Sequence, residues 1–341
     1  MGCVVVVLAC RTVPIGSPLE IVVRKRREGG ICCEHLHCGW IRCDWTPARS
    51  DAGLGWPPCR SDDPFVGRRC AAADLGATPV LGDVFDRARL CELVERAEPE
   101  IVIHQLTAFG AKDADPLAET IRIRKEGTRN LVEAAEKSTA RRLITQSISF
   151  ICTPVESRLT DEETPLYLSA PPAILPLAEA VAEMEERTLH CRRMEGVVLR
   201  YGWFYGPATD YAPAGRIPRA IQAGRMPLVG TGSGAYSFVH VHDAAVATIN
   251  ALTRGETGIY NVVDDAPAKL SEWLPAAAKL LSAPPPAHMD PTLAREKLGD
   301  LMVYVFNEQS GASNRKAKRE LGWEPSIPSW ENGFEDIYAT V

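Results

Sequence analysis

Short apolar runs alternate with amphipathic stretches through the middle of the chain. The runs predict strands and the 3.6-residue periodicity predicts helices. The expected order is strand 79–82, helix 87–96, strand 101–105, helix 117–137, strand 143–147, helix 177–193 and strand 196–201. Strands that alternate with helices in this way indicate βαβ crossovers. The pattern therefore predicts an α/β fold, a doubly wound parallel sheet with helices on both faces.

Beyond residue 201 the predicted elements become shorter and the loops longer. They are a helix at 216–223, a strand at 236–240, a helix at 243–252, a strand at 258–263 and a helix at 270–281. Such pieces predict a small lobe over the carboxyl ends of the sheet strands, where open α/β sheets bind ligands. We expect a dinucleotide-binding domain at 1–195. The segment 196–341 would complete the sheet and form the substrate lobe.

The first 72 residues have a different character. The apolar run VVVVL is followed by ACRTVPIGSPL (9–19), and residues 24–72 show neither a strand nor a helix period. Eight of the 11 cysteines lie before residue 71, which separates this region from the rest of the chain. The basic run 24–27 is interpreted as a solvated helix end. Divergence and a reading-frame error in the gene both remain open as origins of 24–72.

Overall composition narrows the classes of function. The 341 residues carry a net charge of −6, which gives no reason to expect nucleic acid or an anionic membrane as partner. No apolar run approaches the ~18 residues that a membrane span needs. The expectation is a cytoplasmic protein that acts on a small molecule.

Several motifs occur in a familiar order after residue 76. They are GD at 82–83, VIHQLTA (102–108), GTRNLVEAA (127–135), LRYGWFYGP (199–207), SFVHVHDAAVA (237–247), YNVVDDAPAKLSEW (260–273) and SNRKAKRELGWEP (313–325). In this order and spacing the chain resembles the extended short-chain dehydrogenases/reductases, which include NAD-dependent epimerases and dehydratases. The resemblance implies a Rossmann-type fold, NAD or NADP as cofactor, and an oxidoreductase or epimerase-like activity on a sugar-like or carbonyl/alcohol substrate.

The same resemblance implies a set of cofactor-binding residues. Gly16 is the one survivor of the family's three loop glycines, because Cys10 and Val13 occupy the other two positions. Gly16 and Ser17 would hold the pyrophosphate at the start of a following helix. The remaining candidates are Glu34 for a ribose hydroxyl, Asp83 and Val84 beside the adenine, Leu106, Thr107 and Ala108 beside the cofactor, and Tyr201.

The family's catalytic groups are only partly present. Ser147 takes the position of the catalytic Ser, with Ser149 as the alternative. The family's Tyr-x-x-x-Lys is absent, since residues 168–200 contain neither Tyr nor Lys. Its two positions become Leu175/Glu179, Leu177/Val181 or Ala178/Ala182, depending on the glutamate that anchors the alignment. Tyr167 is the candidate substitute acid.

Other residues near the motifs have structural interpretations. His240 and His242 are expected to form hydrogen bonds at a helix start with Asp243 as N-cap. Arg200 is expected in an ion pair and Tyr205 in packing. The cluster CCEHLHCGWIRC (32–43) has irregular spacing for zinc, so we predict no metal site.

Three functional hypotheses remain at this point. The chain is an atypical NAD(P)-dependent enzyme, a non-catalytic dinucleotide-binding scaffold or regulator, or a chain with a defective cofactor loop. Small residues on the expected helices 117–137 and 177–193 also predict a homodimer.

Overall fold

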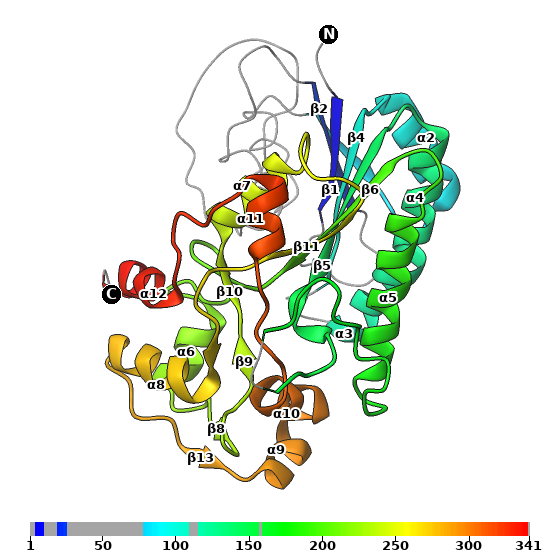
Figure 1. Cartoon of the computed structure of the whole chain (residues 1–341). Helices are drawn as coiled ribbons and strands as arrows, with labels where there is room; N and C mark the ends of the chain where they lie inside the picture. The colour runs from blue at the N-terminus through cyan, green and yellow to red at the C-terminus, as the bar shows by residue number, and fades with distance from the viewer. Residues whose placement is uncertain (1–3, 10–18, 26–77, 109–114, 157–158, 340–341) are drawn as a thin grey trace, which may run out of the picture.

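A seven-stranded sheet forms the centre of the molecule (Figure 1). The structure, a computed structural model, describes residues 4–9, 19–25, 78–108, 115–156 and 159–339. The strand order is β11-β6-β5-β4-β1-β2-β3. These strands are β1 (Val4–Ala9), β2 (Leu19–Lys25), β3 (Thr78–Gly82), β4 (Ile101–Gln105), β5 (Arg142–Ile148), β6 (Glu195–Tyr201) and β11 (Gly258–Val262).

The direction of β2 corrects one expectation. Strand β2 is antiparallel to both β1 and β3, whereas β1, β4, β5, β6 and β11 pair in parallel. Residues 19–25 (LEIVVRK) are rich in β-branched side chains, which favour strands. They pair with β1 from Val4↔Lys25 to Ala9↔Glu20. The expectation of a helix directly after Ser17 is therefore wrong. So is the interpretation of Arg24 and Lys25 as a helix end.

Helices cover both faces of the sheet, as expected. On one face lie α2 (Arg87–Ala97), α4 (Thr128–Lys137) and α5 (Leu175–Leu189), and on the other α7 (Val241–Asn250) and α11 (Arg315–Leu321) (Figure 1). Strands β4 and β5 are buried along their whole length, because both faces are covered.

The helix expected at 117–137 is divided into three parts. It consists of α3 (Pro116–Arg122), a π-helical turn at Ile123–Gly127 and α4. Asp115 caps its start by accepting the backbone N–H groups of Leu117 and Ala118. A single π turn within a helix is common at functional sites.

The C-terminal lobe is built from small elements around an aromatic core. Its elements are β7 (Trp203–Tyr205), α6 (Arg216–Gln222), β8 (Leu228–Val229), β9 (Ala235–Tyr236), β10 (Phe238–His240), β12 (Ala268–Lys269), α8 (Leu270–Leu280), β13 (His288–Met289), α9 (Pro291–Leu298), α10 (Asp300–Asn307) and α12 (Trp330–Tyr338). Tyr205, Tyr211, Phe238, Trp273 and Phe334 contact one another in edge-on and stacked arrangements. Figure 1 shows this lobe beyond one end of the sheet.

Candidate functional site

The carboxyl ends of the parallel strands bring the predicted site residues to one edge of the sheet. Asp83 and Val84 follow β3, Leu106 to Ala108 follow β4, and Ser149 begins a short 3-10 turn (Ser149–Ile151) after β5. Strands β1 and β4 are neighbours at the point where the chain order of the sheet reverses, which is where open α/β sheets bind ligands. Gly16, Ser17 and Glu34 lie outside the described residues.

A buried ion pair lies directly beneath this edge. Arg200 on β6 donates Nε to Glu185 Oε1 at 2.8 Å and Nη2 to Oε2 at 2.6 Å, and both side chains are almost wholly buried. Ser147 Oγ donates to the same carboxylate at 2.6 Å. Burial alone disfavours the charged form of Arg200, but the hydrogen bonds and charge of Glu185 raise its pKa above the ordinary value. The expected ion pair of Arg200 is confirmed, and the Ser147 hydroxyl is engaged in it.

The ion pair also shows which residues of α5 share the face of Glu185. Glu185 points to the sheet, so residues four and eight positions earlier share its face. These are Val181 and Leu177, which are 0% and 1% exposed. The alternative positions Glu179 and Ala182 are more exposed. Of the three candidate registers for the family's Tyr and Lys, Leu177/Val181 is the one that lies on the face of Glu185, and both of its side chains are aliphatic and carry no proton.

A second buried arginine lies on the π turn beside α5. Arg124 is 3% exposed, its Nε has no hydrogen-bond partner among the described residues, and its Nη1 contacts Met184 Sδ at 3.6 Å. Burial lowers its pKa to about 10 although Glu185 acts in the opposite direction. Burial and the charge of Arg124 together lower the pKa of His104 to about 3, so that imidazole is neutral and hydrogen-bonds with Thr128 Oγ1 at 2.8 Å. The site thus holds a cation, Arg124, but this cation lies on the π turn before α4 and not on α5, where the family has its lysine.

Tyr167, the predicted substitute acid, lies beside the segment that follows β5. Its backbone N–H donates to Ile151 O at 3.0 Å, and its ring is tilted on Tyr304 with centroids 5.7 Å apart. Tyr304 in turn donates its hydroxyl to Phe150 O at 2.7 Å. Tyr167 and Ser149 are therefore in the same part of the molecule. Ser149 is 3% exposed and Tyr167 is half-buried.

The groups available to a dinucleotide include two unpaired amide oxygens. Oε1 of Gln105 and Oε1 of Gln146 are buried without a donor among the described residues, at the carboxyl ends of the adjacent strands β4 and β5. Gln105 also hydrogen-bonds with the Tyr201 hydroxyl, which lies 2.6 Å from Thr248 Oγ1 and whose pKa burial raises to about 12. Uncharged acceptors at this edge fit the hydroxyl and carboxamide donors of a nicotinamide nucleoside.

The helix start at His240 differs in detail from the expectation. His240 is the N-cap of α7, and its Nδ1 accepts the backbone N–H of His242 at 3.2 Å. Asp243 lies in the first turn instead of at the cap, because its carboxylate accepts Ser326 N, Ser326 Oγ and Ile327 N and so holds the C-terminal segment. Tyr205 is 0% exposed and packs in the aromatic core, as expected.

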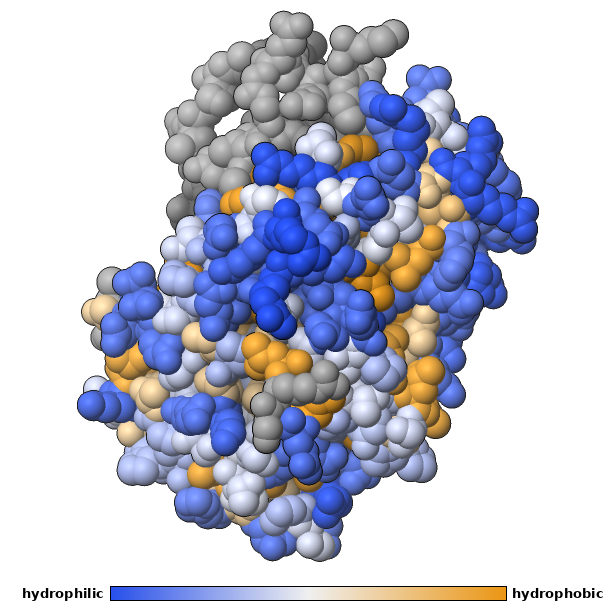
Figure 2. All heavy atoms as spheres, in the orientation of Figure 1, coloured by the Kyte–Doolittle hydropathy of each residue, from blue (hydrophilic) through white to orange (hydrophobic). Residues whose placement is uncertain are grey.

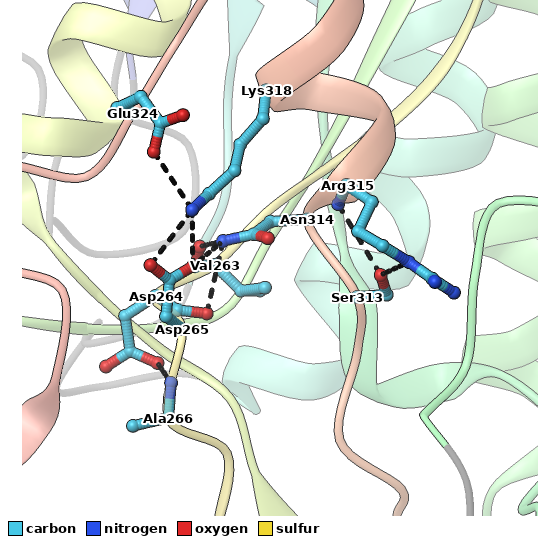
Figure 3. Close-up of polar contacts among 9 residues, drawn as sticks. All are labelled: Val263, Asp264, Asp265, Ala266, Ser313, Asn314, Arg315, Lys318 and Glu324. Carbon is cyan, nitrogen blue, oxygen red and sulfur yellow. Dashed lines mark hydrogen bonds and ion pairs between the residues drawn. The ribbon is translucent and has the colours of Figure 1, made fainter.

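An unpaired acid follows β11. Asp264 Oδ1 accepts the backbone N–H of Ala266 at 3.2 Å, whereas Oδ2 is buried with no partner among the residues described. Burial and nearby acids raise its pKa to about 8. Figure 3 shows Asp264 beside Asp265. Lys318 forms ion pairs with both Asp265 and Glu324. Asp264 is thus mainly protonated at neutral pH.

A groove of about 480 Å³ lies elsewhere, between α4 and α5. Its lining is mostly charged and comes from α4, from the carboxyl-terminal half of α5 and from the residues that follow α5: Arg129, Val132, Glu133, Glu136, Glu183, Glu186, Arg187, His190, Cys191 and Arg192. None of the predicted site residues is among them. Within the described ranges no cluster of His, Cys, Asp and Glu has the arrangement of a metal site, and Cys32 to Cys43 lie outside them. No helix there is long and apolar enough to cross a bilayer.

Comparison with known proteins agrees with this architecture. The model of the NAD dependent epimerase/dehydratase family matches residues 62–263. The chain belongs to the NAD-dependent epimerase/dehydratase family. It is accordingly an atypical NAD(P)-dependent oxidoreductase or epimerase-like protein, and which of the two dinucleotides it prefers is open.

Relatives within this family differ in their reactions. The chain is 43% identical over 259 residues to a 3-diazoavenalumate denitrifying reductase of Streptomyces sp, covering 75% of this chain and 85% of that protein. It is 26% identical over 300 residues to a UDP-N-acetyl-alpha-D-glucosaminuronate decarboxylase of Bacillus cytotoxicus, with 83% and 89% covered.

Solved structures show the same fold. The UDP-glucose 4-epimerase of Thermotoga maritima with UDP-glucose aligns with a TM-score of 0.60 and 21% identity, covering 75% of this chain and 81% of the epimerase. The Thermus thermophilus UDP-glucose 4-epimerase in complex with NAD aligns with a TM-score of 0.57 and 22% identity over 75% and 82%. These structures share the Rossmann-type sheet of this family.

Proposed function

We propose that this protein is an NAD(P)H-dependent reductase that removes a diazo group from a small unsaturated substrate and leaves hydrogen in its place. The name of the Streptomyces relative at 43% identity supports this reaction class. The observation that carries the proposal is the aliphatic pair Leu177 and Val181 on the site-facing side of α5. A member of this family without a proton relay needs a reaction that does not move a proton to or from oxygen.

Reduction of a diazonium carbon is such a reaction. A reduced nicotinamide dinucleotide, when bound, supplies a hydride. The hydride's electron pair forms the new C–H bond, the C–N bond breaks, and its pair leaves with the nitrogen as N2. The charges balance, because a cation and a hydride give two neutral products. No alkoxide forms, so neither a tyrosine acid nor a lysine is required.

The chain's own residues bind and orient in this scheme. Asp83, Val84, Leu106 to Ala108 and Tyr201 are proposed to contact the cofactor, with Gly16, Ser17 and Glu34 at its pyrophosphate and ribose. Ser149 and Tyr167 are proposed to touch the substrate, since both lie beside the turn after β5. Ser147 is proposed to stabilise the buried ion pair rather than to touch the substrate, because its hydroxyl donates to Glu185. The apolar pair Leu177 and Val181 would exclude water from the reacting carbon.

Assembly and location are also proposals. We place the protein in the cytoplasm, where reduced dinucleotides are available. We also propose a homodimer through the exposed sides of α4 and α5. The expected small residues Ala134, Ala135 and Ala178 do not supply this contact, because they are buried in the chain's own core. Figure 2 shows hydrophobic residues among hydrophilic ones on this side of the molecule. Light scattering of the purified protein gives its mass in solution and decides between monomer and dimer.

The test is a reaction with a defined diazo compound. The purified protein, shown to be folded by circular dichroism, is mixed with 4-carboxybenzenediazonium or 3-diazoavenalumate and with NADH or NADPH deuterated at the transferring position. We expect enzyme-dependent oxidation of the cofactor, release of N2 measured by mass spectrometry, and deuterium at the carbon that carried nitrogen. The control is the same mixture with unfolded protein, because diazonium ions react slowly with free reduced cofactor.

Other outcomes would give the protein a different role. Binding of NADH or NADPH without turnover of either diazo compound contradicts the proposal and favours the non-catalytic scaffold. A folded protein that binds neither dinucleotide favours the defective cofactor loop. Turnover of UDP-glucose instead would mean that another acid replaces the family's tyrosine. Tyr167 is the candidate, so Tyr167→Phe would then be the first variant to test.

A further inference from the structure

Arg124 is a buried cation that has no acid of its own in the described part of the chain. Its side chain is 3% exposed, its Nε has no hydrogen-bond partner there, and its Nη1 donates to Met184 Sδ at 3.6 Å. The carboxylate whose charge acts on it is that of Glu185, which already accepts hydrogen bonds from Arg200 and Ser147. Two buried guanidinium groups thus share one carboxylate, and burying the second without a partner costs free energy.

The helix that carries Arg124 places it at the ligand-binding edge of the sheet. One turn before it, Thr120 Oγ1 accepts the backbone N–H of Ala108, which lies beyond β4, at 3.2 Å. One turn after it, Thr128 Oγ1 hydrogen-bonds with His104, near the end of β4, at 2.8 Å. Residues spaced by four share a helix face, so Arg124 faces the sheet at the level where β4 ends. Helical side chains also tilt toward the amino end of their helix, which here lies at the carboxyl edge of the sheet.

On its other side, Arg124 borders the part of α5 where the family has its lysine. Lys125, the next residue on the π turn, forms an ion pair with Glu179 at 3.9 Å, and Arg124 itself contacts Met184. The π turn therefore lies beside residues 179–184 of α5. All three candidate positions of the family's lysine, 179, 181 and 182, belong to this stretch, and none of them carries a cation. The cation comes instead from the neighbouring helix.

We propose that Arg124 binds the carboxylate of an acidic substrate, with its unpartnered Nε as one of the donors. This inference rests on the proposed function and names its substrate class, a diazo compound that also carries a carboxylate. A carboxylate accepts charge-assisted hydrogen bonds from a guanidinium and supplies the missing counter-charge. An uncharged sugar hydroxyl would accept a hydrogen bond but would leave the buried charge uncompensated.

The two faces of the sheet favour the substrate over the cofactor as the source of this anion. Successive strand residues point to opposite faces, so His104 points toward Arg124 and α4, whereas Gln105 points toward Tyr201 on the side of α7. The unpaired oxygen of Gln105, which fits a nicotinamide nucleoside, is thus on the other face from Arg124. Phosphate oxygens of the dinucleotide offer similar chemistry, and the test below separates them from a substrate carboxylate.

The test compares an acid with its uncharged ester. The folded protein is titrated calorimetrically with 4-hydroxycinnamate and with methyl 4-hydroxycinnamate, each with and without NADH or NADPH. We expect the native protein to bind the acid at least about tenfold more tightly than the ester. In Arg124→Met, which keeps much of the side-chain volume without the charge, the acid should bind about 10- to 100-fold more weakly and the ester equally well.

Two further variants control for charge and for position. Arg124→Lys keeps a cation and should lose less affinity for the acid than Arg124→Met does. Lys125→Met removes the neighbouring cation of the same π turn, which pairs with Glu179 at the surface, and should keep the native preference for the acid.

Stability gives a second readout, which separates binding from a structural role. Because Arg124 is buried without a counter-charge, Arg124→Met should resist urea at least as well as the native protein. A variant that unfolds at lower urea concentration and keeps the preference for the acid would make Arg124 a structural residue and overturn the proposal. Weaker binding of NADH or NADPH to Arg124→Met, with an unchanged preference for the acid, would assign the cation to the cofactor and overturn it too.

The remaining outcomes separate this site from the proposed reaction. Equal affinity of the native protein for acid and ester, including no measurable binding of either, overturns the carboxylate site. If the acid is preferred through Arg124 and no diazo compound is reduced, the carboxylate site stands and the proposed reaction fails. If a diazo acid and its ester are reduced with equal KM, the reaction stands and the carboxylate site fails.

Discussion

Two carboxylates at the sheet's carboxyl edge are buried to the same degree and have opposite surroundings. Glu185 is 3% exposed and Asp264 is 2% exposed. Glu185 accepts two hydrogen bonds from Arg200 and one from Ser147. Asp264 accepts a backbone N–H at one oxygen, while its Oδ2 has no partner in the described part of the chain.

Because both acids are buried, the difference between them comes from the partners that the neighbouring elements supply. β6 directs a guanidinium at α5, so the carboxylate there is held in an ion pair that fixes the helix against the sheet. Burial raises the pKa of Asp264 to about 8, and the charges of Asp265 and Glu331 act in the same direction. No cation pairs with Asp264 among the described residues. The first acid is part of the scaffold, and the second is a proton-bearing group at the lobe junction.

Removing the paired carboxylate should have the largest effect. Glu185→Ala leaves Arg200 buried without a partner, so we expect a loss of about 3 to 5 kcal/mol in the free energy of unfolding, measured with urea. Glu183→Ala, which breaks a surface pair with Arg187 on the same helix, is the control and should cost less than about 0.5 kcal/mol. Equal losses of unfolding free energy in the two variants would show that the buried pair stabilises the chain no more than a surface pair does.

The protonation of Asp264 should make the free energy of unfolding depend on pH. The pKa of Asp264 is about 8 in the folded chain against an ordinary 3.8, so between these values the folded state holds a proton that the unfolded state has released. Stability from this group is complete at acid pH and falls as pH rises, by about 1.4 kcal/mol per pH unit, until the folded pKa is passed.

Asp264→Asn removes this dependence. Between about pH 5 and about pH 7 we expect the native chain to lose 2 to 3 kcal/mol more than the variant, measured by urea unfolding at both values. Glu324→Gln, which changes an acid paired with Lys318, should keep the native slope. If the unfolding free energy of Asp264→Asn fell with pH as steeply as that of the native chain, Asp264 would be ionised in the folded chain.

The smallest effect is expected for the hydroxyl that joins the ion pair. Ser147→Ala deletes one hydrogen bond to a carboxylate that keeps its arginine, so the loss in unfolding free energy should be about 1.5 kcal/mol. Turnover of a diazo substrate should change by no more than about twofold. A loss of about a hundredfold or more in kcat, with the fold intact, would make Ser147 a catalytic residue instead.

Most of the fold could be predicted from periodicity. Strands β4, β5 and β6 and helix α2 occur within two residues of their expected ranges, because continuous apolar runs and helical stripes are local properties of the chain. The antiparallel β2 could not be predicted. Residues 19–25 are a strong strand former, but strand direction depends on which neighbours accept its hydrogen bonds.

The sequence showed which residue types the candidate site contains and which it lacks, but not which side chains contact one another. The absence of Tyr and Lys from residues 168–200 is visible in the sequence. No local pattern in the sequence indicates that Arg124 is a buried cation on a π turn. The stacking of Phe150 on Trp203 was not expected either, because the two rings are 53 residues apart in the sequence and meet only through the pairing of β5 with β6.

The sequence by itself determined the order of the elements, the family motifs that mark the sheet edge and the loss of the proton relay. These follow from residue type and spacing along one chain. Only the tertiary structure decided that Leu177 and Val181 share the buried face of α5 with Glu185 and that Ser147 donates to the Glu185–Arg200 pair. It also decided that Asp264 Oδ2 has no partner among the described residues. The reason is physical: burial and charge compensation depend on partners from distant segments, and a side chain's chemistry is fixed by what the fold places beside it.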